Sequence, residues 1–194
     1  MLRASVGVDS NPEEEERGVA AKTRLQVKRW VQGADTVEID AAQLPDDVEW
    51  ALQVDAAPNR TVTISQRTSI PDRLEVSMGL RMGPAHSAAF KALSDAQRAR
   101  FVYALRRDAI LLGVFYQGIG DPLVRMGYTR RVYVNALTQT SFMDAFYAVQ
   151  NALILARGFV QIHLGPGDTD TGATDIEPDG PFGDFLSGLD LGDI

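Results

Sequence analysis

Three consecutive segments in which apolar and polar residues alternate constrain the fold of this chain more than any other feature. They are residues 48–55, 61–66 and 74–82, and the last alternates without a break from Leu74 to Met82. Alternation with a period of two places one set of side chains on a dry face and the other on a wet face, which is typical of an antiparallel sheet. The two short links contain turn residues. The sequence therefore predicts a three-stranded meander.

Patterns typical of helices precede and follow the meander. Residues 13–32 place acids in the first turn and repeat apolar residues at helical spacing. Further on, Ser94 and Gln97 have the spacing of a capping box, and Ser141 has the sequence context of an N-cap. The remaining expected elements are a short helix over 84–93, a helix from Ser94 to about Leu112, β-like segments over 114–119 and 130–135 separated by a loop over 120–129, and a long last helix that begins after Ser141.

These elements predict a fold class and a simple organisation of the chain. The fold class is α+β, with an antiparallel sheet, made of the meander and the two later strands, flanked by N-terminal, central and C-terminal helices. We expect a flexible acidic arm over residues 1–16 and a single domain over residues 17–164. Residues 165–194 are rich in Gly, Asp and Pro and predict a largely disordered acidic tail with a short apolar motif.

The net charge of −7 belongs to the two ends of the chain. Residues 165–194 carry eight acids and no base, and residues 1–16 carry five acids and one base. The middle of the chain therefore holds 18 bases and 13 acids, a net charge of +5. Its bases are scattered along the sequence, whereas nucleic-acid binders usually cluster them, so we do not expect a nucleic-acid partner.

Residues that carry out catalysis or bind metals are scarce. The 194 residues include no cysteine, which excludes disulfides, thiolate nucleophiles and cysteine metal sites. The two histidines, His86 and His163, belong to no catalytic or metal-binding motif. We expect His86 to be a surface or capping residue, and His163 to interact with the dipole at the end of the last helix. The sequence predicts no catalytic residue, no metal and no cofactor, in a protein that is not an enzyme.

No segment of the sequence has the pattern of a secretory signal or a membrane span. The first residues contain no apolar core of signal-peptide length. The longest apolar-rich stretch, residues 152–164, is too short and too polar to cross a bilayer. We expect a cytoplasmic protein without a membrane partner.

The last helix and the apolar motif after it predict a contact surface for protein. From Ala152 onward the helix is apolar on both sides, which predicts that something besides the sheet covers it. A second copy of the chain and the acidic tail are the two alternatives. The candidate partner-binding residues are Leu155, Phe159 and Ile162 in the helix, and Phe182, Phe185, Leu186 and Leu189 in the tail.

Several arginines form a second candidate site. Basic residues near the two later strands are a candidate anion patch for phosphate, RNA or an acidic peptide, and a solvated basic face is the alternative. These residues are Arg106, Arg107, Arg125, Arg130 and Arg131.

Three stretches of the sequence resemble a known fold family. They are PDRLEVSMGLRM running into the helix from Pro84, FVYALRRDAILLGVFYQGI, and RRVYVNALTQTSFMDAFYAVQNALILA. Over roughly residues 20–164 the order of elements is similar to that of the type III secretion chaperone-like fold, and most closely to uncharacterised prokaryotic YbjN-like proteins. The resemblance implies a homodimer that holds an extended segment of a client protein on its surface.

Two functions from different classes fit these observations. The first is a non-enzymatic protein-interaction module that binds an extended or amphipathic segment of a partner protein, or its own C-terminal tail. The alternative is a small-molecule-binding protein or enzyme with a pocket lined by arginine and tyrosine, between the sheet and the helices.

Overall fold

The computed structural model describes residues 12–32, 34–57 and 60–166, and it confirms the α+β class. Within these residues a six-stranded antiparallel sheet is combined with four α-helices and two short 3₁₀ helices. In chain order the elements are α1 (Pro12–Trp30), β1 (Asp35–Glu38), η1 (Ala41–Gln43), β2 (Val48–Ala57), β3 (Arg60–Arg67), β4 (Ile70–Arg81), α2 (Pro84–Ala92), α3 (Asp95–Leu111), β5 (Phe115–Gln117), β6 (Arg125–Tyr133), η2 (Val134–Ala136) and α4 (Gln139–Leu164).

The predicted meander is present, and the sheet has one strand more than expected. Its order is β1-β2-β3-β4-β6-β5, with every neighbouring pair antiparallel. Strand β1 was not expected, because its four residues are mostly exposed and show no alternation. The prediction of a loop over residues 120–129 was wrong in its second half, since β6 begins at Arg125. Glycine disfavours strands, and Gly127 lies in this half of β6. The strand forms nevertheless, because β6 pairs along its whole length with β4, where Gly127 lies opposite Gly79.

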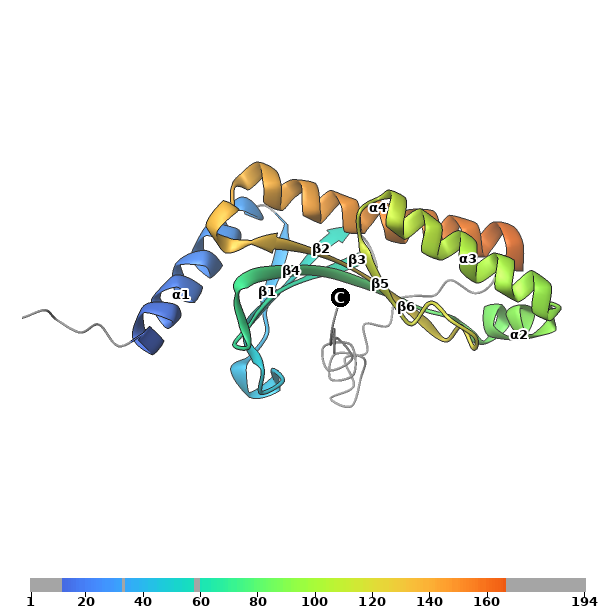
Figure 1. The fold of residues 1–194 in the computed structure, drawn as a ribbon, viewed down its shortest axis with the longest axis horizontal. Helices are drawn as coiled ribbons and strands as arrows, with labels where there is room; N and C mark the ends of the chain where they lie inside the picture. The colour runs from blue at the N-terminus through green and yellow to red at the C-terminus, as the bar shows by residue number, and fades with distance from the viewer. Residues whose placement is uncertain (1–11, 33, 58–59, 167–194) are drawn as a thin grey trace, which may run out of the picture.

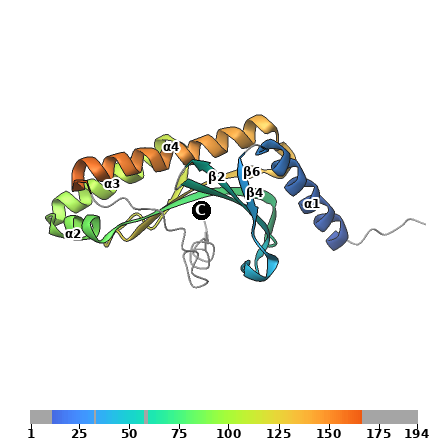
Figure 2. The same ribbon diagram turned by 180° about the vertical axis from the view of Figure 1, so that it is seen from behind.

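The sheet is bent into an arch with its helices on the outer side (Figure 1). Helix α4 runs along the arch with α3 beside it, α1 lies against the outer flank at one end, and α2 lies at the other end. The view from behind shows the same arrangement (Figure 2). No helix of the described residues lies on the inner side of the arch, so the two faces of the sheet have different surroundings.

The outer face of the sheet forms the hydrophobic core together with the helices. Leu74, Val76 and Met78 of β4 are at most 3% exposed, and Tyr128 beside them in β6 is equally buried. Helix α4 packs on these two strands through one seam, with Phe142 at its start. This is the dry face that the alternation predicted.

The inner face is polar, and in its middle it is buried as well. Thr63, Ser65, Glu75 and Ser77 are all buried, although the alternation predicted that they would be on a wet face. Glu75 is buried because the side chains of two arginines converge on it, as described below. The expectation of one fully wet face was therefore wrong for the centre of the sheet.

Helix α4 begins three residues earlier than the sequence predicted. Its N-cap is Thr138, whose hydroxyl accepts from the backbone N–H of Ser141, while the Ser141 hydroxyl accepts from the backbone N–H of Thr138. Ser141 therefore occupies the third helical position of a reciprocal capping box instead of the cap itself. The capping box at Ser94 and Gln97 that starts α3 is confirmed.

Two polar contacts fix the end of the molecule where α2, α3 and α4 meet. His86 is buried, and its Nε2 donates to the carbonyl oxygen of Gly165, 3.1 Å away, just after α4. The expectation of a surface or capping histidine was wrong, because the end of α4 folds against the first turn of α2. His163, in contrast to His86, is exposed. Its ring lies against the ring of Phe159, with a distance of 4.2 Å between the centroids.

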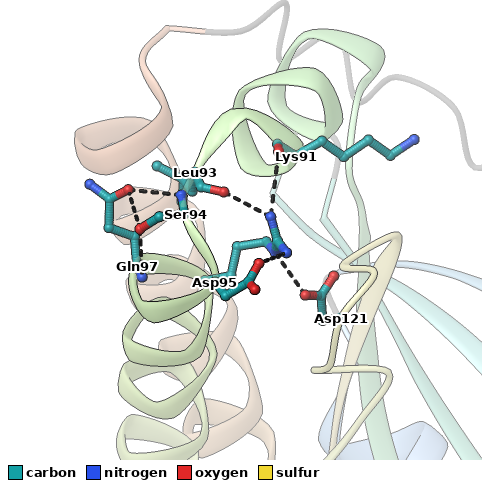
Figure 3. A network of polar contacts seen from close by, with 7 residues as sticks. Lys91, Leu93, Ser94, Asp95, Gln97 and Asp121 are labelled. Atoms are coloured by element: carbon teal, nitrogen blue, oxygen red, sulfur yellow. Dashed lines mark hydrogen bonds and ion pairs between the residues drawn. The ribbon is translucent and has the colours of Figure 1, made fainter.

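The second contact is made by the side chain of Arg98 in α3. Its partners Leu93, Asp95 and Asp121 are labelled in Figure 3. Its guanidinium donates to the carbonyl oxygen of Leu93 at 2.7 Å and to the carboxylate of Asp121, beyond β5, at 2.7 Å. The hydrogen bond and the charge of Asp121 raise the pKa of Arg98, with a further contribution from Asp95. The α2–α3 turn and the β5–β6 loop are thereby held together.

Candidate interaction surfaces

Helix α4 exposes a stripe of large apolar side chains on the side away from the sheet. Tyr147, Ile154, Leu155 and Ile162 lie on this stripe, because they are separated by seven, eight and fifteen residues along the helix. They are between 44% and 80% exposed. A helix that packs on one side only would carry polar residues here.

Helix α3 exposes a similar stripe beside α4. Tyr103 and Ile110 lie seven residues apart, and Leu111 follows directly; all three are at least 65% exposed. Exposed Arg100 and Arg107 lie on the same side of the helix, so apolar and basic side chains alternate along it. We call the seven exposed apolar residues of the two helices the outer apolar surface: Tyr103, Ile110, Leu111, Tyr147, Ile154, Leu155 and Ile162.

The two helices are joined by aromatic packing beneath this surface. Phe101 of α3 lies 4.8 Å from Phe159 of α4, measured between ring centroids, and 5.6 Å from Phe90 of α2. These contacts cover part of the second apolar side of α4 that the sequence left without a partner. The helices α2 and α3 therefore account for some of its apolar character, and the exposed stripe is what remains.

The structure divides the predicted partner-binding residues into three groups. Leu155 and Ile162 are exposed and belong to the outer apolar surface. Phe159 is half-buried in the aromatic packing and has a structural role. The four in the apolar motif lie outside the described residues: Phe182, Phe185, Leu186 and Leu189.

The arginines of the predicted anion patch do not all lie on one face of the sheet. Arg130 and Arg131 are neighbours in β6 and point to opposite faces of the sheet. Arg130 donates to the carbonyl of Leu112 on the helical side, at 3.5 Å, and Arg125 lies at the start of β6, opposite Arg81 on the inner face.

The two arginines of α3 are engaged separately. Arg106 donates through two nitrogens to the carbonyl of Ile119, at 2.8 and 2.6 Å, and its guanidinium lies over the ring of Tyr116. Arg107 donates to Asp108 at 2.7 Å, and this hydrogen bond raises its pKa. These contacts join Arg106 to the segment after β5 and Arg107 to its neighbour in α3.

An ionic cluster on the inner face was not found by sequence reasoning. The carboxylate of Glu75 accepts from Arg131 at 2.9 Å and from Arg67 at 3.2 Å, and Arg67 also pairs with Asp47. The guanidinium of Arg131 lies 5.1 Å from the centre of the Phe115 ring. Only the register of β3, β4 and β6 brings these residues together, so a sequence pattern of one strand could not reveal the cluster.

The described residues show little space for a small ligand beside this cluster. A shallow depression lined by Arg67, Ile70, Arg73 and Glu75 has no room for a water molecule. Nowhere in residues 12–32, 34–57 and 60–166 do three His, Cys, Asp or Glu side chains gather as metal ligands would. No helix in the same ranges combines the length and apolar character needed to cross a bilayer.

Together, these features define a class of protein: an α+β domain whose curved antiparallel sheet has its helices on one side, and whose helices α3 and α4 expose stripes of large apolar side chains. Residues 23–158 match the model of the family described as "Uncharacterized conserved protein (DUF2299)", and the chain belongs to this family. No curated protein matches the chain.

A solved structure with the same fold comes from Methanothermobacter thermautotrophicus and is described as an uncharacterised protein. The two structures superpose with a TM-score of 0.66, at 18% sequence identity. The match covers 74% of this chain and 99% of that chain. At this identity the similarity concerns the fold alone.

Proposed function

We propose that this protein is a non-enzymatic interaction module that binds an amphipathic segment of protein on the outer apolar surface of α3 and α4. The observation that carries the proposal is the exposure of seven large apolar side chains on two neighbouring helices. Single exposed apolar residues are ordinary in soluble proteins, but repeated ones on adjacent elements are typical of contact sites.

The spacing of the exposed residues fits a helical or extended segment that follows the helices. Tyr103 and Ile110, Tyr147 and Ile154, and Leu155 and Ile162 are each separated by seven residues, which is two helical turns. Covering one such side chain contributes roughly 1.5–3 kcal/mol before the cost of ordering the partner. A few anchors on the partner therefore suffice for measurable binding.

The charges of α3 favour an acidic partner. Helix α3 carries four arginines against two aspartates, and Arg100 and Arg107 lie on the same side of the helix as its exposed apolar residues. Acidic side chains between the partner's apolar anchors would face these arginines. Such complementary charges determine the association rate and the register more than the affinity.

The type III secretion chaperone-like fold is part of this proposal. The order of helix, meander, two helices, two strands and long helix supports it, as do the sequence stretches that resemble that family. Members of that fold hold an extended segment of a client protein, which is the activity proposed here. A cytoplasmic location and the absence of a nucleic-acid partner belong to the same proposal.

A labelled peptide with leucines at i, i+3, i+4 and i+7 on a glutamate background tests the proposal by fluorescence anisotropy. The protein is the full chain with Phe182, Phe185, Leu186 and Leu189 each changed to Ser, because these residues share the spacing of the probe. This variant is called the serine chain below. We expect the peptide to bind it, and a scrambled peptide of the same composition to bind about tenfold more weakly.

Substitutions on the surface provide the matched controls. Adding Leu155→Asp to the serine chain should weaken peptide binding by about tenfold or more, since one apolar anchor is lost and an acid is placed near an acidic ligand. Val37→Asp changes an apolar residue that is as strongly exposed as Leu155 but lies on the edge strand β1, away from α3 and α4. This substitution should leave peptide binding unchanged. Equal binding of both peptides, or of both variants, would refute the proposal.

A further inference from the structure

The apolar motif of the sequence matches the outer apolar surface in spacing, and the tail that carries the motif is opposite in charge to the exposed arginines of α3. Phe182, Phe185, Leu186 and Leu189 stand at i, i+3, i+4 and i+7, the anchor spacing of an amphipathic helix that lies in an apolar groove. Residues 167–194 contain eight acids and no base, while Arg100 and Arg107 lie on the same side of α3 as its exposed apolar residues. We propose that residues 182–189 occupy the outer apolar surface of their own molecule; this rests on the proposed function of that surface.

The position at which the chain leaves the fold suits this contact. The hydrogen bond from His86 to Gly165 holds the end of α4 in place. From Gly165 back to Leu155 and Tyr147, the rise of the helix spans about 15 Å and about 27 Å. The 15 residues from 167 to 181 have, as a flexible chain, a root-mean-square length of roughly 22 Å. A linker whose length matches the span gives its segment an effective concentration on the order of millimolar.

The contact is one that an outside partner can displace. Gly183 and Gly188 lower the helical propensity of the segment, and a helix this short is marginal in water. Its order therefore has to come from the surface it covers, at an entropic cost that weakens binding. A weak contact at high effective concentration keeps the surface covered until a partner with better anchors competes for it.

The absence of cysteine from the chain allows a direct test with two introduced spin labels. Asn151→Cys places one label on the exposed side of α4, between Tyr147 and Leu155, and Ser187→Cys places the other between the anchors Leu186 and Leu189. We expect a narrow distribution at short distance in the full chain. The same labels in the serine chain should give a broad distribution around roughly 33 Å, because about 21 Å of helix from Asn151 to Gly165 combines with a flexible chain of roughly 26 Å from there to residue 187. Identical broad distributions in both chains would overturn the inference.

The peptide measurement separates this inference from the function on which it rests. The unaltered chain should bind the amphipathic peptide about tenfold more weakly than the serine chain, because its own segment competes. Equal affinities in the two chains, with the Leu155→Asp effect retained, would overturn the inference and leave the proposed function standing. No binding to either chain would refute the function. A mixture of two chains, one labelled at residue 151 and the other at residue 187, tests whether the segment binds a second copy. A short distance in this mixture, and none within the doubly labelled chain, would assign the contact to a second copy and overturn the inference.

Discussion

At the scale of the residue, Tyr128 shows how burial controls a side chain that could otherwise titrate. It is 1% exposed, and its hydroxyl contacts the sulfur of Met126 at 3.6 Å, a weak acceptor. Burial raises the pKa of Tyr128 far above its ordinary value, because the phenolate would lose its hydration in the core. The folded state therefore keeps the proton under conditions in which the unfolded chain releases it.

This difference predicts a loss of stability at alkaline pH. The contribution is fully present below the unfolded pKa of about 10, and above it falls by about 1.4 kcal/mol for each pH unit until the folded pKa is reached. Tyr128→Phe should remove this part of the loss while changing the free energy of unfolding at neutral pH by less than about 1.5 kcal/mol. Urea titrations at neutral and alkaline pH would measure it. Tyr103→Phe, at an exposed position, is the control, and an unchanged alkaline loss in Tyr128→Phe would contradict the prediction.

At the scale of the element, the cluster around Glu75 connects three strands. Arg67 is in β3, Glu75 in β4 and Arg131 in β6, and the side chains of all three are at most 12% exposed. A buried carboxylate between two guanidinium groups is tolerated only because each charge has its partner. The cluster therefore favours the observed register of the strands, since a shift by one residue would separate the charges.

Glu75→Gln should destabilise the fold strongly. It keeps the shape of the side chain but leaves two buried arginines with too little negative charge, which should cost roughly 3–5 kcal/mol in the free energy of unfolding. Asp72→Asn is the matched control, because Asp72 pairs with Arg73 at the surface and should change stability by less than about 1 kcal/mol. Chemical denaturation of the two variants measures the difference; equal losses would show that the cluster has no special role.

The elements that the sequence predicted are those whose signal is local. The alternating strand over residues 74–81 and the capping box at Ser94 depend on neighbouring residues and were predicted correctly, although β4 begins four residues earlier, at Ile70. The first half of β6 and the ion pairs of Glu75 depend on which strands become neighbours, which one sequence pattern does not reveal. The outer apolar surface was foreseen in part, through Leu155 and Ile162, because an excess of apolar residues on a helix can be read from its periodicity. The stripe on α3 was missed, since its apolar residues are mixed with arginines.

At the scale of the whole molecule, one surface has several possible occupants. The homodimer expected from the sequence and the contact with residues 182–189 would both use the exposed sides of α3 and α4. The two contacts exclude each other because they need the same surface. The affinity of the surface for a second copy, relative to its affinity for residues 182–189, therefore determines the oligomeric state.

The serine chain should therefore self-associate more strongly than the unaltered chain. We expect light scattering over a range of concentrations to show a larger dimer fraction in the serine chain, because its apolar surface is left uncovered. Adding Leu155→Asp should reduce that fraction again, whereas Val37→Asp should not. A serine chain that remains monomeric at every concentration would contradict the expected homodimer.

The two edge strands of the sheet limit the ways in which copies of the protein can associate. The edge strand β1 has four residues, and the edge strand β5 at the other side of the sheet has only three. Edge strands this short present few unpaired backbone groups, so they give a poor template for fibril growth. We therefore expect copies of this protein to meet through side chains of their helices and not through an open-ended ladder of main-chain hydrogen bonds.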